Sequence, residues 1–189
     1  MPSDNHANYV SAGKPKIGGA IYRAPKGTAA PTSADATLGT AFKAMGYISS
    51  DGLTNSNNST TDNIKAWGGE IVMVVQTEKT DTLKFTMLEA LNTDVLAAVF
   101  GTGNVSGTLQ SGVTVEVNAD MQVEAVWVID MILNGNTAKR IVAPNAIISN
   151  VADIVYRDDE AIGYGVTLTC MPDSSDNTHY EYIKAATST

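Results

Sequence analysis

The sequence predicts a mainly β fold of about eight or nine strands with one helix, built as a single domain. Short apolar segments are separated by clusters of turn-forming residues, and the hydrophobic period becomes helical at only one place. The chain of 189 residues is long enough to bury one substantial core. Hydrophobic residues make up 43% and charged residues 17%, which excludes a disordered chain and suggests that neighbouring molecules cover part of the surface.

The N-terminal part is expected to contain little regular structure. Residues 1–16 are polar without a hydrophobic period and are expected to form an arm, so the domain spans 17–184 and 185–189 form a tail. Residues 20–22 are expected to form a short strand. Prolines and glycines make 24–36 an extended loop, and 38–46 form at most a weak helical turn.

The next stretch combines a long polar segment with an apolar one. Residues 51–63 are almost all turn or loop formers, which predicts a polar loop over about residues 51–66. It runs directly into Glu70–Thr77, an apolar run typical of a strand covered on both faces. A long polar excursion beside such a strand is unusual in a single domain.

The single helix is predicted at about residues 93–100, after a strand in which residues 83, 85 and 87 share an apolar face. Asn92 is a suitable N-cap, Asp94 places an acid in the first turn, and Gly101 is a natural end. The glycine-rich residues 101–112 are expected to form a plain loop, because their spacing does not fit a dinucleotide-binding motif.

Strands resume after this loop. Alternating valines predict a strand at 113–117, and a longer one follows at 121–133. A turn at 134–139 leads into a strand at 140–149. Near the C-terminus, Tyr164, Val166, Leu168 and Cys170 are expected to share one face, and 179–184 form a last strand.

Charge and composition exclude several functions. The formal net charge of −8 and the pI near 4.6 argue against binding to nucleic acid or to an anionic membrane. The N-terminus lacks the apolar segment of a secretory signal, and no stretch approaches the ~18 apolar residues of a membrane span. We therefore expect a protein of the reducing cytosol without a membrane partner.

No set of residues indicates an enzyme, a cofactor site or a metal site. His6 and His179 lie near the termini and are expected to be solvated, and the acids at 158–160 are expected at a solvated turn. Trp67 and Trp127 are expected in the core or in an interface. Cys170, the single cysteine, is expected to be buried.

Four segments resemble the major tail tube proteins of long non-contractile-tailed bacteriophages, in the same order and at similar spacing. They cover well over half of the chain and run from Ile21 to Thr54, Ser59 to Val72, Leu83 to Gly101 and Ala143 to Asp173. The resemblance implies a tail-tube fold, an antiparallel β-sandwich or half-open barrel with one flanking helix. It also implies rings of six copies that stack into the tube carrying the genome, with no enzymatic activity.

The resemblance also implies partners and a location. The chain would bind itself within and between rings, and would meet a tape measure protein, a tail terminator and a distal tail protein. The genome would pass through the lumen without specific binding. The location would be the virion tail, after assembly in the host cytoplasm.

Two sets of candidate residues follow. In this family the long early loop reaches an adjacent ring, which gives an inter-ring loop of Leu53, Thr54, Asn55, Ser56, Asn57, Asn58, Ser59, Thr60, Thr61, Asp62 and Asn63. A channel that lets DNA slide is expected to be net negative, because like charges prevent contacts with phosphates. The acids on or beside strands are the candidates for this wall, namely Glu70, Glu116, Asp120 and Glu124.

Two alternatives remain at this point. A tube protein of a contractile tail or secretion system would share the same ring architecture. A carbohydrate-binding β-sandwich module would be a soluble monomer and would use exposed aromatic rings.

Overall fold

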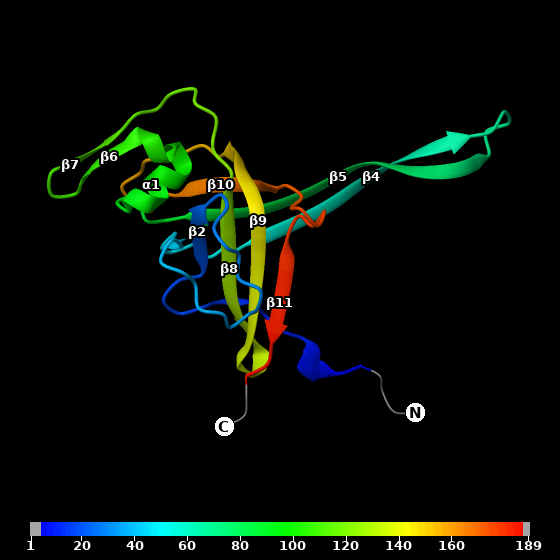
Figure 1. Ribbon diagram of the computed structural model, residues 1–189, viewed down its shortest axis with the longest axis horizontal. Helices are drawn as coiled ribbons and strands as arrows, with labels where there is room; N and C mark the ends of the chain where they lie inside the picture. The colour runs from blue at the N-terminus through cyan, green and yellow to red at the C-terminus, as the bar shows by residue number, and fades with distance from the viewer. Residues whose placement is uncertain (1–4, 187–189) are drawn as a thin grey trace.

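The computed structural model describes residues 5–186 and contains one nine-stranded antiparallel sheet, a two-stranded sheet and one α-helix (Figure 1). The large sheet has the order β3-β2-β8-β9-β10-β5-β4, with β1 paired to β8 and β11 paired to β9. The strands are β1 (Lys14–Pro15), β2 (Ile21–Pro25), β3 (Lys43–Ala44), β4 (Thr54–Lys65), β5 (Ile71–Met87), β6 (Val105–Thr108), β7 (Gly112–Val115), β8 (Ala125–Leu133), β9 (Thr137–Val151), β10 (Tyr164–Cys170) and β11 (Tyr180–Lys184). The helix α1 spans Thr93–Phe100, and 3-10 turns lie at Ala7–Tyr9, Thr102–Asn104 and Asn134–Asn136.

Strand β9 bends the sheet into two layers. One edge of β9 pairs with β8, whereas the other pairs with β11 over residues 138–142 and with β10 over 146–151. In Figure 1, β5 and β10 cross the direction of β8, β9 and β11. The rings of Phe85 on β5 and Trp127 on β8 meet edge to face at 5.8 Å, so the layers pack against each other. The predicted antiparallel, mainly β fold with one helix is confirmed, and the barrel is not closed.

The core lies between these layers and under α1. Tyr164, Val166, Leu168 and Cys170 are buried and alternate with less buried residues, as predicted for β10. On β5, Leu83, Phe85 and Met87 alternate in the same way. Helix α1 adds four buried residues, Val95, Leu96, Ala98 and Val99, and the Asn92 side chain accepts a hydrogen bond from the Asp94 amide, which confirms the predicted N-cap.

The opposite face of β8 and β9 is also buried, under the segment that joins β2 to β3. Val126, Val128 and Asp130 are all buried although they alternate with core residues. Arg140 from β9 donates to the carbonyl oxygens of Ser33 and Ala36, which holds this segment across the sheet (Figure 1). The sheet is therefore covered on both sides where β8 and β9 pair.

Residues 10–15 run along the end of β8. Lys14 and Pro15 pair with Ile132 and Met131. Asn134 donates its backbone N–H to the Ser11 hydroxyl and its side-chain N–H to the Val10 carbonyl oxygen. This part of the predicted N-terminal arm is attached to the β8–β9 turn.

Three sequence predictions about local structure are wrong. The polar segment predicted as a loop contains strand β4, and the glycine-rich segment 101–112 contains strand β6 and the turn that joins it to β7. Residues Lys43 and Ala44 form strand β3 where a helical turn was the expectation. In each case a paired strand imposes the extended conformation, namely β5 on β4, β2 on β3 and the valine-containing β7 on β6, so pairing overrides local propensity. Position 107 requires a glycine. Its φ is 87°, and a Cβ there would lie 2.0 Å from the Gly112 carbonyl oxygen.

Candidate functional site

The most conspicuous feature is a long hairpin formed by β4 and β5 that projects from the body (Figure 1). The two strands pair from Thr54 opposite Lys84 to Lys65 opposite Ile71, and residues 66–70 form the turn. Strand β10 supports β5 only over residues 82–87. Residues 58–79, which we call the arm, therefore form a two-stranded ribbon. Such a ribbon has marginal stability in water when nothing packs against it.

The arm exposes an unusual amount of apolar surface. Trp67 at the tip is fully exposed, Ile64 is 49% exposed, and the side chains from Ile71 to Val75 are between 36% and 62% exposed. The prediction that Glu70–Thr77 is covered on both faces is therefore wrong within one chain. An apolar pattern of this kind predicts a strand in the core. This strand instead lies outside the core, on a ribbon that no second layer covers within the described residues.

The predicted inter-ring residues lie along β4, apart from Leu53, which packs against the core. Asn58–Asn63 lie on the arm opposite the apolar strand, with Asn63 facing Val74 and Asp62 facing Val75. Strand β4 is also an edge of the large sheet, so no other strand within residues 5–186 pairs with its outer side. The polar segment is thus a strand edge that can accept a partner.

The base of the arm is fastened by a buried carboxylate. Asp81 is 1% exposed, and one of its oxygens contacts the Thr178 hydroxyl and His179 Nδ1, each at 2.5 Å. His179 Nε2 lies 3.5 Å from the Asn55 amide nitrogen of β4. The prediction that His179 is solvated is wrong, since its side chain is 12% exposed. The contact joins residues 98 positions apart, which no local pattern could reveal.

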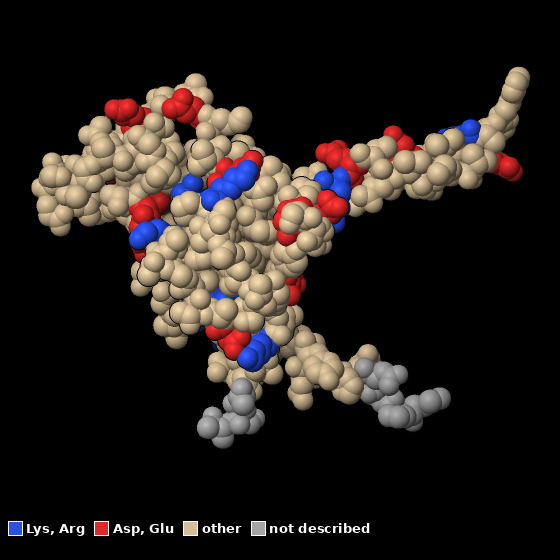
Figure 2. Space-filling view, in the orientation of Figure 1, with Lys and Arg blue, Asp and Glu red and all other residues tan. Residues whose placement is uncertain are grey.

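The four candidate lumen acids do not gather at one place in a single chain. Glu70 lies in the turn of the arm, whereas Glu116 and Asp120 lie in the connection from β7 to β8 at the other end of the long axis (Figure 1). Glu124 precedes β8 and forms an ion pair with Lys26. Acidic side chains are visible at both ends of the molecule in Figure 2. A shared acidic wall would therefore need several copies.

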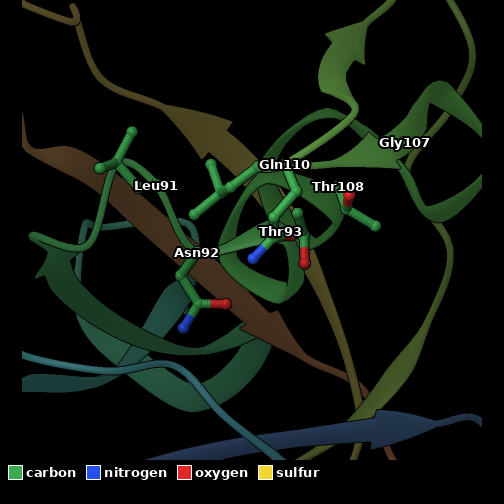
Figure 3. A pocket seen from close by; sticks show the side chains of 7 residues that line it. Leu91, Asn92, Thr93, Gly107, Thr108 and Gln110 are labelled. Atoms are coloured by element: carbon green, nitrogen blue, oxygen red, sulfur yellow. The ribbon is translucent and has the colours of Figure 1, made fainter.

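A groove opens at the end of the body opposite the arm. It has a volume of about 580 Å³ and is lined by residues 88–92 together with Ala161 and Ile162. A second hollow of about 290 Å³ adjoins it, shares Leu91 and Asn92, and continues along Thr93 and residues 107–110 of the β6–β7 hairpin (Figure 3). Leu91 is 71% exposed between the two. No local sequence pattern predicts this groove, because its walls come from separate loops.

The remaining chemistry-bearing residues are placed as follows. Trp127 and Cys170 are buried in the core, as predicted, and the acids at 158–160 are exposed. Burial raises the pKa of the Cys170 thiol to about 12, and the charge of Asp81 adds to the effect. Within residues 5–186, no group of three or more His, Cys, Asp or Glu side chains is placed to hold a metal ion. No helix in the described part of the chain is long and apolar enough to cross a lipid bilayer.

The sequence matches the family described as phage tail tube protein over residues 2–189. The chain belongs to this family. Members are structural proteins of the phage tail, so the resemblance noted in the sequence is confirmed, and membership implies self-assembly into a tube in the virion tail.

The tail tube protein is similar to the solved anti-feeding prophage cap, described as the AFP tube terminating cap, with a TM-score of 0.46 and 10% sequence identity over 94% of this chain and 95% of that chain. The comparison with curated protein sequences gave no match.

Proposed function

We propose that this chain forms rings of six copies, that the rings stack into the phage tail tube, and that the genome passes through the tube at infection. The family match supports a tube, and the apolar arm is the observation that supports stacking. The arm has no second layer within its own chain, so a surface of another copy is needed to remove its apolar side chains from water.

The two strands of the arm would contribute differently to stacking. The apolar residues of β5 supply burial at roughly 25 cal/mol per Å² of apolar surface. The Asn, Ser and Thr side chains of β4 offer short donors and acceptors that lose little entropy when fixed. Each polar contact contributes only about 1 kcal/mol, but the copies of a ring act together. Leu53 to Asn63 thus remain the proposed inter-ring segment, in which Thr54 to Asn63 belong to strand β4.

The channel is proposed to be net negative. Repulsion between carboxylates and phosphates would prevent the counterion-releasing contacts that hold DNA in place. Glu70, Glu116 and Asp120 are the better candidates for its wall, because the ion pair with Lys26 largely neutralises Glu124. A tube structure with a wall lined mainly by Lys and Arg would contradict this part of the proposal.

The remaining partners follow from the role of a tube. A tape measure protein inside the growing tube, a tail terminator at one end and a distal tail protein at the other are proposed partners, and assembly is proposed to take place in the host cytoplasm. The genome is proposed to pass without specific binding.

Purified protein at increasing concentration tests this function. We expect sedimentation to show six-copy rings or longer species, and negative-stain electron microscopy to show tubes with a central channel. A single monomer species at every concentration, with no tubes even when tail-initiation components are added, would contradict the proposal.

A further inference from the structure

The arm tip and the groove lie at opposite ends of the long axis of the molecule (Figure 1). The tip follows β4 and carries Trp67. The groove is built where β5 ends, before α1 begins, and where the chain approaches β10. When one surface of a chain binds a different surface of the next copy, the contact is head-to-tail. A head-to-tail contact that does not close into a ring produces an open filament.

We propose that the groove at residues 88–92 and 161–162 is the receptor for the arm tip of a second copy of this chain, with Trp67 as the anchor. This inference rests on the proposed stacking of rings and identifies the two surfaces that would meet.

The size and the chemistry of the two surfaces match. The groove is lined mostly by apolar side chains, namely Leu88, Ala90, Leu91, Ala161 and Ile162. Its volume of about 580 Å³ lies within the range of roughly 300–1,000 Å³ that accommodates organic groups. Trp67 is fully exposed, and a Trp side chain buries about 150–250 Å² when it enters such a site. Covering the groove would also bury Leu91.

Charge favours one orientation of the tip. Glu89 lines the groove, and the exposed residues Asp158, Asp159 and Glu160 immediately precede Ala161 in the chain, so acidic side chains adjoin this side of the groove. Glu160 also contacts Arg157 at 3.2 Å, as an exposed pair. Lys65 precedes Trp67 by two residues and forms no ion pair with any residue that the structure describes. Lys65 would therefore face the acidic side of the groove, and Glu70, on the other side of the turn, would lie away from it.

Cross-linking tests the contact while Trp67 is retained. Gly68 has open space around it and no positive φ, so Gly68→Cys is tolerated at the tip. The test pair combines it with Ala161→Cys, and the control pair combines it with Ile183→Cys on β11, which is 60% exposed and away from the groove. Both are made with Cys170→Ala. In the test pair a bond within one chain is excluded, because the arm tip and the groove lie at opposite ends of the long axis (Figure 1).

We expect oxidised tubes of the test pair to give a ladder of linked chains on non-reducing gels, and those of the control pair to give monomers. Tubes of the test pair without a ladder, or a ladder from both pairs, would overturn this inference and leave the proposed function intact. If the unmodified chain forms no tubes, the proposed function fails and this inference fails with it.

Substitutions at the tip provide a second measurement. Trp67→Ala is expected to raise the protein concentration needed for tube growth by about tenfold or more, because it truncates the residue that anchors the contact. Trp67→Phe is expected to raise it less, because an aromatic ring remains. Lys65→Glu is expected to raise it as well, whereas Lys14→Glu, the same charge change on the exposed strand β1 at the end of β8, is expected not to. The proposed docking would be contradicted if Trp67→Ala formed tubes at the same protein concentration as the unmodified chain. It would also be contradicted if the two charge changes raised this concentration equally. Circular dichroism checks that each variant is folded.

Discussion

Asp130 and Arg140 form a buried ion pair that joins three parts of the fold. Arg140 Nε and Nη2 donate to the two Asp130 oxygens at 2.6 and 2.8 Å, and Nη1 donates to the Ser33 and Ala36 carbonyls. Both residues are at most 3% exposed. The planar guanidinium satisfies two strands and the covering segment together, which a lysine could not do.

Arg140→Met is expected to lower the free energy of unfolding by about 3–5 kcal/mol, because it leaves the Asp130 carboxylate buried, with Lys16 at 3.5 Å as its remaining ion-pair partner among the described residues. The double variant Asp130→Leu/Arg140→Met is expected to be more stable than the single variant, since it removes the unpaired charge. Urea unfolding at pH 7 measures both. A loss below about 1 kcal/mol for Arg140→Met would show that the pair does not matter for stability.

Cys170 gives a second prediction at this scale. Its pKa of about 12 keeps the thiol protonated, so the folded chain should not react with a thiol reagent at pH 8, whereas the chain in denaturant should react at one thiol. The unfolded thiol ionises near ~8.5, so the folded state should lose stability as the pH rises above that value towards 12. Cys170→Ala should remove this contribution. Rapid labelling of the folded protein at pH 8 would refute the prediction.

The arm is the element whose role can be tested most directly. Ser59 and Lys79 are opposite each other, so replacing residues 60–78 by Asn-Gly closes the hairpin with a favoured two-residue turn. The removed side chains are almost all exposed, so the melting temperature should change little. Rings should still form, but tubes should not, as judged by electron microscopy.

A matched variant separates arm length from arm chemistry. Changing Ile71–Val75 to threonines keeps a good strand former at each position and removes only apolar surface. It should also fail to elongate. Normal tubes from the shortened arm would show that the arm has no role in stacking, and normal tubes from the threonine variant would show that its apolar surface has none.

The elements differ in how well the sequence predicted them. Strand β10 and helix α1 were predicted from their periods because each has one face in the core and one outside. Strand β4 was missed because Asn and Ser disfavour strands, and its partner β5 imposes the extended conformation. Strand β5 was predicted, but its apolar pattern does not show whether the residues that pack on it belong to the same chain or to another molecule. The groove and the Asp81–His179 contact depend on residues far apart in sequence and left no local signal.

At the scale of the whole molecule, the fluorescence of the two tryptophans can be used to follow assembly. Trp127 is 1% exposed and Trp67 is fully exposed, so in the single chain acrylamide should quench only Trp67. Assembly should shift the emission to shorter wavelength and reduce quenching, because the indole leaves water. Trp67→Phe, which retains only Trp127, should show neither change. Quenching that is the same before and after tube growth would mean that Trp67 stays in water.

Strand β5 runs without interruption from the turn of the arm to the residue before the groove. At about 3.3 Å per residue its 17 residues extend roughly 55 Å. In a tube built by contact between tip and groove, this one strand would span the distance between successive joints and act as a ruler for the axial repeat. A pull along the tube would be carried by the covalent backbone of β5 and by the hydrogen bonds with β4, which would have to shear together. Tensile strength would then be limited by the joint at each end of the strand, and the body of each subunit would bear little of the load.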